Sequence, residues 1–322
     1  THDKNEGTDS VTPDARVWNG YNALSDLIPV ARLCGVTTVL VHPATNRLVS
    51  GQAALFHTAG ERVSEALVHA PAALCVNLGR SGIGGDHGPQ TRMGVAMRLR
   101  QLMEEAEPPV KLRGSGRRKE VRAAEDEQSL SDEVMTDVRG KKLPVLAHAQ
   151  RVDDILFALE LADEYQLDLI LLGAAEGHLV AGDLADAGVP VFLGPTTVQP
   201  SSFEHLHARY DNAAQLFAAG VKLGLRTGSA HRVRNLPTEA GIAVAHGLPF
   251  EAAIRALTAN PAEVLGLSGL GRLELGSEAT FFQASGDPLQ PRTRIHQVWI
   301  SGQPMDMSSR QTRLYQEFRE LD

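Results

Sequence analysis

The chain has 322 residues, with 31 Lys plus Arg and 39 Asp plus Glu, so its formal net charge is −8. Hydrophobic residues make up 43% and charged residues 22%, which excludes a chain that is disordered throughout. The acidic balance argues against a dedicated nucleic-acid binder, and no apolar run reaches the roughly 20 residues that cross a bilayer. At this length we expect one large domain, or one large and one small.

In the first part of the chain, helical and strand patterns are widely spaced. A helix is predicted over Ala23–Leu33, and the β-branched run Gly35–Val41 predicts a strand that ends at His42. A further strand is expected around Ala72–Val76, and an amphipathic helix over Met93–Glu105. The two cysteines lie in apolar segments and are expected to be buried thiols, which leaves the redox compartment and the cellular location open.

From residue 129 onward, helical patterns alternate with short, almost continuous apolar runs. This alternation is typical of βα units whose parallel sheet is covered on both faces. No glycine-rich dinucleotide fingerprint follows any strand, so a closed (β/α)8 barrel is favoured over an open sheet. The predicted strands are 143–148, 167–172, 189–193 and 221–225, and the predicted helices are 129–138, 152–165, 177–187, 212–219, 237–246, 251–258 and 261–265.

After Leu267 the pattern changes to short strands separated by Gly, Pro and Asp, predicted over 271–276, 279–283 and 296–300, and then to a helix over 311–321. We therefore divide the chain into an α/β barrel over residues 1–266, the strands of a small β domain over 267–307 and a terminal helix over 308–322. The stretch 108–128 places basic KLRGSGRRKEVR before acidic residues, and we expect it to be a solvated insertion in the barrel.

The order of these segments resembles the amidohydrolase superfamily, and within it the imidazolonepropionase-like branch. The resemblance runs from about Val36 to Met305 and is carried by GVTTVLVHP, LPVLAHAQRVDDILFALELA, AGVPVFLGP, AAIRALTANPAEVLGL and GRLELGSEATFFQASGDPL. It implies a (β/α)8 TIM-like barrel with a small β-sandwich, and hydrolysis of C–N bonds, other than peptide bonds, in cyclic amide-like substrates. It also implies one or two divalent metal ions, zinc among them, at the carboxyl ends of the strands.

The metal ligands of the family transfer only in part. His148 matches the histidine of strand 5, but Gly173 stands where strand 6 carries a histidine, and Gly228 stands where strand 8 carries an aspartate. The Lys of strand 4 has no counterpart in residues 73–77. The His-x-His of strand 1 is also missing, and because Thr1–Asp3 resembles the loop after that strand, we expect the chain to begin just past it. His178 and the pair His205 and His207 fall outside the family pattern and are expected to be surface histidines.

Two functions stay open at this stage. One is a metal-dependent hydrolase with impaired catalysis, for which His148, Glu176 and His231 are the candidate catalytic residues and His148 the candidate metal ligand. The other is a catalytically inactive binding or structural domain of a larger multi-domain amidohydrolase. In both cases we expect the metal of the family to be absent or weakly bound. A nucleophile-based hydrolase has little support, because the chain has no Gly-x-Ser-x-Gly motif.

In either case the ligand cleft is expected at the carboxyl ends of the strands, where it would bind a small molecule. Nucleic acid and membrane are not expected partners; an upstream segment, a second amidohydrolase domain or a second copy of the chain is. Besides the three catalytic candidates, the residues predicted to face the cleft are His42, Asn77, Arg80, Arg151 and Ser229.

Overall fold

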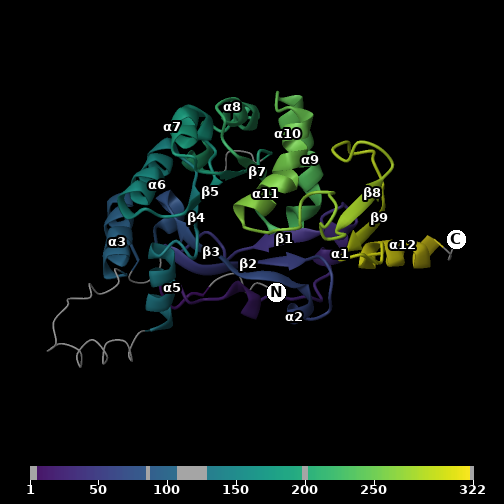
Figure 1. Cartoon of the computed structure of the whole chain (residues 1–322), viewed down its shortest axis with the longest axis horizontal. Coiled ribbons are helices and arrows are strands. Elements are labelled where there is room, and N and C mark those ends of the chain that lie inside the picture. The colour runs from purple at the N-terminus through teal and green to yellow at the C-terminus, as the bar shows by residue number, and fades with distance from the viewer. Residues whose placement is uncertain (1–5, 85–87, 107–128, 198–201, 320–322) are drawn as a thin grey trace.

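The computed structural model describes residues 6–84, 88–106, 129–197 and 202–319 of the chain. The expected insertion over 108–128 and the Thr1–Asp3 segment therefore lie outside the described residues. Within the described part, the chain forms an α/β fold around one large sheet, with a small second sheet near the C-terminus (Figure 1).

The large sheet has seven strands, which lie in the same order in space as in the sequence. It curves into a half-barrel, with β1 and β7 at its two open edges, which is consistent with the expected TIM-like barrel (Figure 1). Strands β3 to β7 are parallel, whereas β1, β2 and β3 form an antiparallel meander. The strands are β1 (Thr38–Val41), β2 (Val49–His57), β3 (Leu67–Asn77), β4 (Val145–Ala149), β5 (Leu169–Gly173), β6 (Val191–Leu193) and β7 (Leu223–Leu225).

Strand β2 has no counterpart among the predicted elements. Its sequence contains Gly51 and Gln52, which break both the alternating and the continuous apolar pattern of a strand. The strand is nevertheless buried along almost its whole length, because β1 and β3 pair with its two edges. The N-terminal segment covers part of it, and the ring of Tyr21 stacks on that of Phe56 with 3.8 Å between ring centroids.

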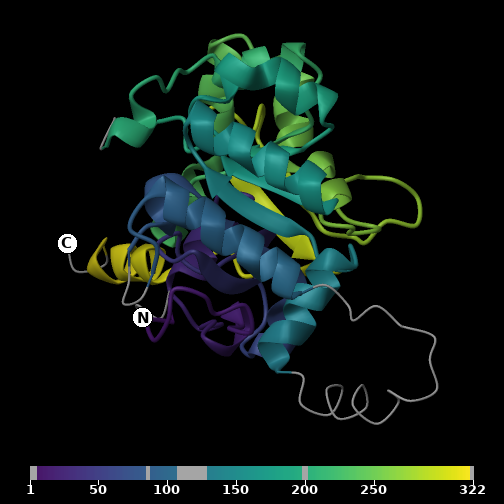
Figure 2. The ribbon, with the colours of Figure 1, turned by 90° about the vertical axis from the view of Figure 1, so that its left-hand side faces the viewer.

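Helices cover the convex face of the sheet. Figure 2 shows α3 and α6 side by side in this layer. The sequence predicted the bounds of both helices to within one residue. Ser129 caps the following helix, as expected, since its hydroxyl accepts a hydrogen bond from the backbone N–H of Asp132. The helices of this layer are α3 (Arg92–Glu105), α5 (Leu130–Arg139), α6 (Val152–Tyr165), α7 (Ala181–Asp186), α8 (Asn212–Ala218), α9 (Leu236–Ala245) and α10 (Phe250–Leu257).

The concave face of the sheet is also apolar, which explains why the strand sequences do not alternate. On β4, Val145 and Ala147 belong to the core under the convex-face helices, whereas Leu146 belongs to a second core on the concave face. Helix α11 (Ala259–Val264) closes this second core, with Val264 and Leu265 packed against it. Side chains of the same parity as Leu146 therefore point into the hollow of the half-barrel.

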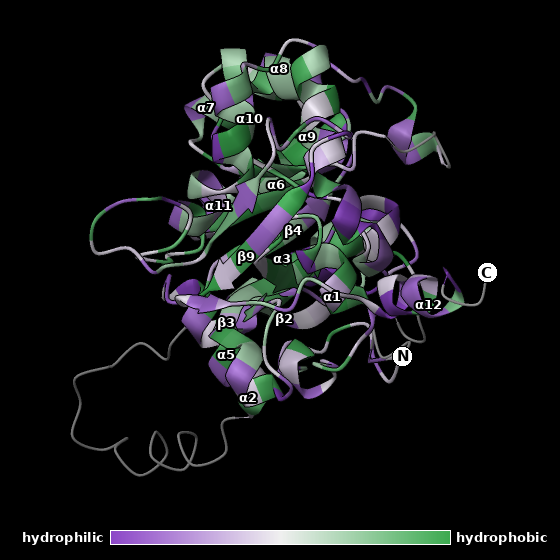
Figure 3. Cartoon of the chain, turned by 90° about the vertical axis from the view of Figure 1, so that its right-hand side faces the viewer, coloured by the Kyte–Doolittle hydropathy of each residue, from purple (hydrophilic) through white to green (hydrophobic). Residues whose placement is uncertain are grey.

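The C-terminal region forms a three-stranded antiparallel sheet of β8 (Phe281–Ala284), β9 (Ile295–Ile300) and β10 (Gln303–Pro304). The strand predicted over 271–276 does not form, because Leu273 and Leu275 both lie exposed in a loop with no strand beside them. Helix α12 (Arg310–Arg319) buries none of its residues, and Figure 3 shows hydrophilic residues on it and on β9.

Two short helices complete the described elements, α1 (Leu27–Arg32) and α2 (Val63–Ala66). The first is shorter at both ends than the predicted helix over Ala23–Leu33. Among the described helices, none combines the length and the apolar character that a bilayer crossing requires.

Candidate functional site

Three polar side chains meet at the carboxyl ends of the parallel strands, on the concave side of the sheet. His148 has the same parity on β4 as the inward-facing Leu146, and His42 has the same parity beyond β1 as the inward-facing Leu40. Arg226 follows β7 directly and, by the same alternation, faces the side opposite to Leu223 and Leu225. The positive charge of Arg226 lowers the pKa of both histidines. With His205 they form what we call the histidine–arginine cluster.

His148 is the most enclosed member of the cluster, with 8% of its surface exposed. Its pKa is lowered to about 3, chiefly by burial and in addition by the positive charge of Arg226 and by the neighbouring His42 and His205. The imidazole of His148 is therefore neutral at pH 7. Such a weak base is a poor acceptor of protons from water, which argues against the general-base role that the sequence suggested for it.

The side chain of Gln150 lies over Gly173 and contacts His148. Its carbonyl oxygen accepts a hydrogen bond from the N–H of Ala175 at 3.1 Å, so its amide nitrogen donates to Nε2 of His148 at 2.9 Å. A Cβ atom at position 173 would lie 2.6 Å from this amide nitrogen. The space that a side chain at position 173 would need is thus filled by Gln150.

The hydrogen bond from Gln150 also defines the tautomer of His148. Because Nε2 accepts, the proton of the neutral ring is on Nδ1. This Nδ1 atom is buried and has no hydrogen-bond partner within the described part of the chain. The ring therefore carries one donor whose acceptor is missing.

His42 is half-buried and also neutral at pH 7. Its Nδ1 donates to the carbonyl oxygen of Pro43 at 2.7 Å. Burial and, to a smaller extent, the charge of Arg226 together lower its pKa to about 4, although the hydrogen bond to Pro43 opposes them. His42 was predicted to face the cleft, and in the structure it lies on the concave side of the sheet with His148 and Arg226.

Three other predicted cleft residues make structural contacts instead. The carboxylate of Glu176 accepts a hydrogen bond from the N–H of Val152 at 2.9 Å, so it caps the start of α6. The amide of Asn77 donates to the hydroxyl of Ser50 at 2.7 Å and to a backbone carbonyl between β1 and β2. Arg151 pairs with Asp153 at 3.1 Å in the first turn of its own helix.

The remaining predicted residues lie at the rim. Arg80 and His231 are exposed, and Ser229 begins the 3-10 helix Ala230–Asn235 with no side-chain hydrogen bond to its end. His205 was predicted to be a surface histidine, but it contributes to the lowered pKa of His148. His207 is exposed and influences the pKa of His178 instead.

The residues at these strand ends do not fit a divalent metal ion of the family type. Across the described residues, no group of three or more His, Cys, Asp or Glu side chains is arranged to hold a metal. Gly173 and Gly228 offer no donor atom, and Nε2 of His148 already accepts from Gln150. A catalytic zinc site needs three protein ligands and one open position.

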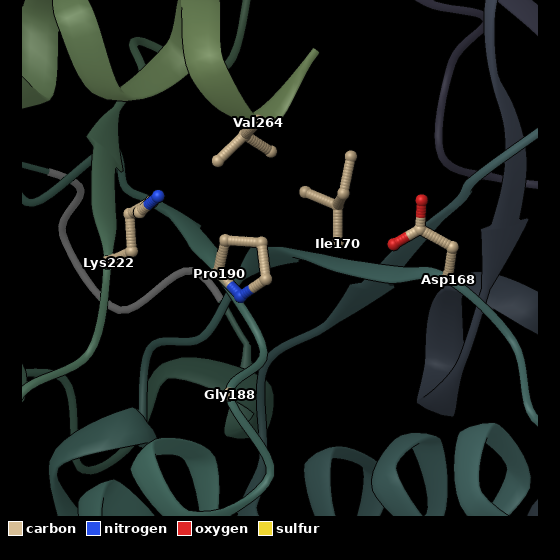
Figure 4. Close-up of a pocket in the computed structure, with 6 residues that line it drawn as sticks. All are labelled: Asp168, Ile170, Gly188, Pro190, Lys222 and Val264. Carbon is tan, nitrogen blue, oxygen red and sulfur yellow. The ribbon is translucent and has the colours of Figure 1, made fainter. Parts of the chain in front are cut away.

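Two cavities in the described part of the chain lie at opposite ends of the parallel strands. The smaller, of about 20 Å³, is lined by Gln150, Gly173 and His205 among others, and has room for one water molecule. The larger, of about 240 Å³, is lined by Asp168, Pro190 and Lys222, which precede β5, β6 and β7 (Figure 4). Because catalysis in such folds takes place at the carboxyl ends of the strands, size does not make the larger cavity the active site.

Comparison with known proteins gives the family of this chain. Residues 33–305, from α1 to the end of the small sheet, match the model of the amidohydrolase family. The chain belongs to the amidohydrolase family. The small sheet is thus part of the same family match as the half-barrel, as the resemblance over Val36 to Met305 implied.

Two amidohydrolases illustrate the similarity. The structure of an amidohydrolase from Thermotoga maritima MSB8 superposes with a TM-score of 0.84 and is 28% identical, over 94% of this chain and 80% of that one. The amidohydrolase tasK of Hapsidospora irregularis is 25% identical over 93% of this chain. The chain spans 33% of the length of that curated relative.

Proposed function

We propose that this amidohydrolase-family chain is a degenerate, metal-free member that binds a small ligand at the carboxyl ends of its parallel strands. The observation that carries the proposal is the position of Gln150. Its amide fills the space above Gly173 and donates to Nε2 of His148, the atom that would otherwise be free to ligate a metal ion. Gly228 adds a second position without a donor atom.

Loss of the aspartate expected at position 228 would matter even with a metal present. General acid–base catalysis contributes roughly 10² to 10⁴ in rate, and Gly228 supplies no group for it. Glu176 and His231, the alternative bases suggested by the sequence, are respectively engaged in capping α6 and exposed at the rim. The family mechanism thus lacks both a metal site and a positioned base among these residues.

The second candidate function is impaired hydrolysis of a C–N bond in a cyclic amide-like substrate. It is favoured by the amidohydrolase family match and by the similarity to the Thermotoga maritima amidohydrolase. Under this alternative, His148 would have to lose its hydrogen bond to Gln150 before it could bind a metal ion.

The test is metal analysis together with a hydrolysis assay on the purified chain. After incubation with Zn²⁺ and removal of free metal, we expect less than about 0.2 equivalents of bound zinc. We also expect no turnover of hydantoin, imidazolone or dipeptide substrates. Stoichiometric zinc that is lost in His148→Gln, or turnover that needs His148, would overturn the proposal.

The variant Gln150→Ala is the matched comparison, since it frees Nε2 of His148 and leaves the two glycines in place. If Gln150 alone blocked metal binding, this variant would bind zinc. We expect it to stay metal-free, because one histidine does not make a zinc site.

A further inference from the structure

Arg226 carries a positive charge that the described residues leave unpaired. Its side chain is only partly exposed, and burial lowers its pKa to about 10 with no opposing influence from any carboxylate. Within the described part of the chain, the side chain of Arg226 takes part in no ion pair and no hydrogen bond. A partly buried guanidinium without a counter-charge is unfavourable, so its surroundings favour an anion.

The neighbours of Arg226 add hydrogen-bonding groups but no negative charge. Nδ1 of His148 is a buried donor without an acceptor among the described residues. A guanidinium fork together with a ring N–H matches the oxygen atoms of an oxyanion. The cluster thus offers one full positive charge and at least one unsatisfied donor.

The count of charges distinguishes between classes of oxyanion. A monoanion would neutralise the single charge of Arg226, whereas a phosphate dianion would leave an excess negative charge in a partly buried site. The planar fork of arginine also matches the two oxygens of a carboxylate. Both arguments favour a carboxylate over a phosphate.

We propose that the histidine–arginine cluster is a binding site for a small carboxylate, with Arg226 as its anchor. This inference rests on the proposed function, because it assigns ligand binding rather than metal-dependent hydrolysis to the carboxyl ends of the strands. The ligand class is a molecule with one carboxylate group, small enough to reach a partly exposed arginine beside Gly228.

The test is calorimetric titration of the full chain with acetate and with N-acetylglycine. Acetamide, which lacks the charge, and inorganic phosphate serve as comparison probes. We expect saturable binding of both carboxylates at neutral pH, no binding of acetamide, and weaker binding of phosphate than of N-acetylglycine. Binding should raise the pKa of His42, followed by NMR of its ring, because the bound anion counteracts the field of Arg226.

Two variants separate a specific role of Arg226 from general electrostatics. Arg226→Gln should weaken carboxylate binding at least about tenfold, as expected for loss of a charge-assisted contact. Arg209→Gln changes an exposed arginine at the same end of the strands, one that already pairs with Asp211 at 2.7 Å, and should bind carboxylates as the wild type does. The thermal stability of ligand-free Arg226→Gln should match or exceed that of the wild type, which excludes misfolding as the cause of weaker binding.

Three results would overturn the inference: no binding of either carboxylate, equal binding by wild type and Arg226→Gln, or binding of phosphate alone. Metal content and hydrolysis are measured on the same sample. Bound zinc or turnover would contradict the proposed function, whereas carboxylate binding that needs Arg226 would still support the site. A metal-free, inactive protein that ignores carboxylates would contradict the site alone.

Discussion

At the scale of single residues, the backbone conformation of Gly173 and its neighbour Gln150 limit which side chains this position can hold. The residue has φ +105°, a backbone conformation that L-residues rarely adopt, and Gln150 fills the space beside it. Any side chain at this position must therefore overcome both backbone strain and a steric clash. The absence of a histidine here is thus tied to the present conformation of the strand end.

A pair of glycine substitutions tests this interpretation. Gly173→Ala should lower the free energy of unfolding by about 2–3 kcal/mol, because strain and contact with Gln150 combine. Gly188→Ala is the matched control, since its φ is +64° and nothing lies within 4 Å of the added Cβ, so it should cost about 1 kcal/mol. Urea denaturation measures both values. Equal losses of stability in the two variants would indicate that the side chain of Gln150 moves aside without lowering the free energy of unfolding.

The neutral His42 predicts a pH dependence of stability. Its pKa is about 4 in the folded chain and about 6.5 when unfolded, so between these values the unfolded state binds more protons. Stability should therefore be highest above pH 6.5 and fall as the pH drops toward 4, by up to about 1.4 kcal/mol per pH unit for this group. Urea midpoints measured from pH 7 to 4 should change less steeply in His42→Asn than in the wild type.

His231→Asn is the control for this experiment, because His231 is exposed at the rim. Its pH profile should follow that of the wild type. If the profile of His42→Asn also followed the wild type, His42 would not be the titrating group that links stability to pH.

How far the sequence predicts the site depends on the parity of each strand. His42 and His148 were found because each stands at the end of an apolar run. Arg226 and Gln150 also follow an apolar run, and each shares a face with an inward-pointing residue of β7 or β4. They were not predicted, because the family pattern places its ligands at other positions, such as Gly228. His205 could not be predicted, because it reaches the cluster from a loop whose path no local pattern defines.

At the scale of elements, α3, α6 and the 3-10 helix Phe203–His205 are joined by one arginine. The guanidinium of Arg92 contacts Asp154 at 2.8 and 2.9 Å and Glu204 at 2.7 Å. The side chain of Asp154 is 6% exposed, and burial raises its pKa while Arg92 opposes that rise. Arg92 thus compensates the charge of two buried carboxylates from different elements.

Removal of this arginine should be costly. Arg92→Gln leaves Asp154 without a counter-charge and should lower the free energy of unfolding by about 3 kcal/mol. Arg100→Gln, on the same helix, breaks exposed pairs with Glu160 and Glu164 and should cost less than about 1 kcal/mol. Chemical denaturation compares the two variants.

The double variant Arg92→Gln with Asp154→Asn provides a further check. It removes the uncompensated charge and should recover part of the stability lost in Arg92→Gln alone. No recovery would mean that Arg92 acts through packing of its side chain rather than through charge.

Element prediction from the sequence succeeded where helices and strands alternate and failed in the meander. Helix α6 has the predicted bounds Val152–Tyr165, because its apolar positions repeat at helical spacing. Strand β2 was missed, since its burial comes from pairing with β1 and β3 and from the N-terminal segment, none of which leaves a local pattern. Long-range pairing of this kind is a property of the folded chain.

At the scale of the whole molecule, apolar packing joins the parts of the half-barrel that the described residues form. Both faces of the sheet carry apolar cores, and α11 closes the concave one. The partners expected from the sequence, an upstream segment, a second amidohydrolase domain or a second copy of the chain, stay predictions. The lack of a metal-ligand group among the described residues predicts how the stability of the chain responds to metal ions.

Neither chelator nor zinc should change the melting temperature of the chain. A ligand at 100 times its Kd that binds only the folded state adds about 2.7 kcal/mol of stability, which shifts Tm by several degrees in a protein of this class. Because Gln150, Gly173 and Gly228 leave no ligand set beside His148, we expect no such rise with Zn²⁺ and no fall with EDTA in scanning calorimetry. Binding of zinc to histidines of the unfolded chain would, if anything, lower Tm. A zinc-dependent rise that disappears in His148→Gln would contradict the metal-free assignment, whereas the same rise in both proteins would locate the metal away from this histidine.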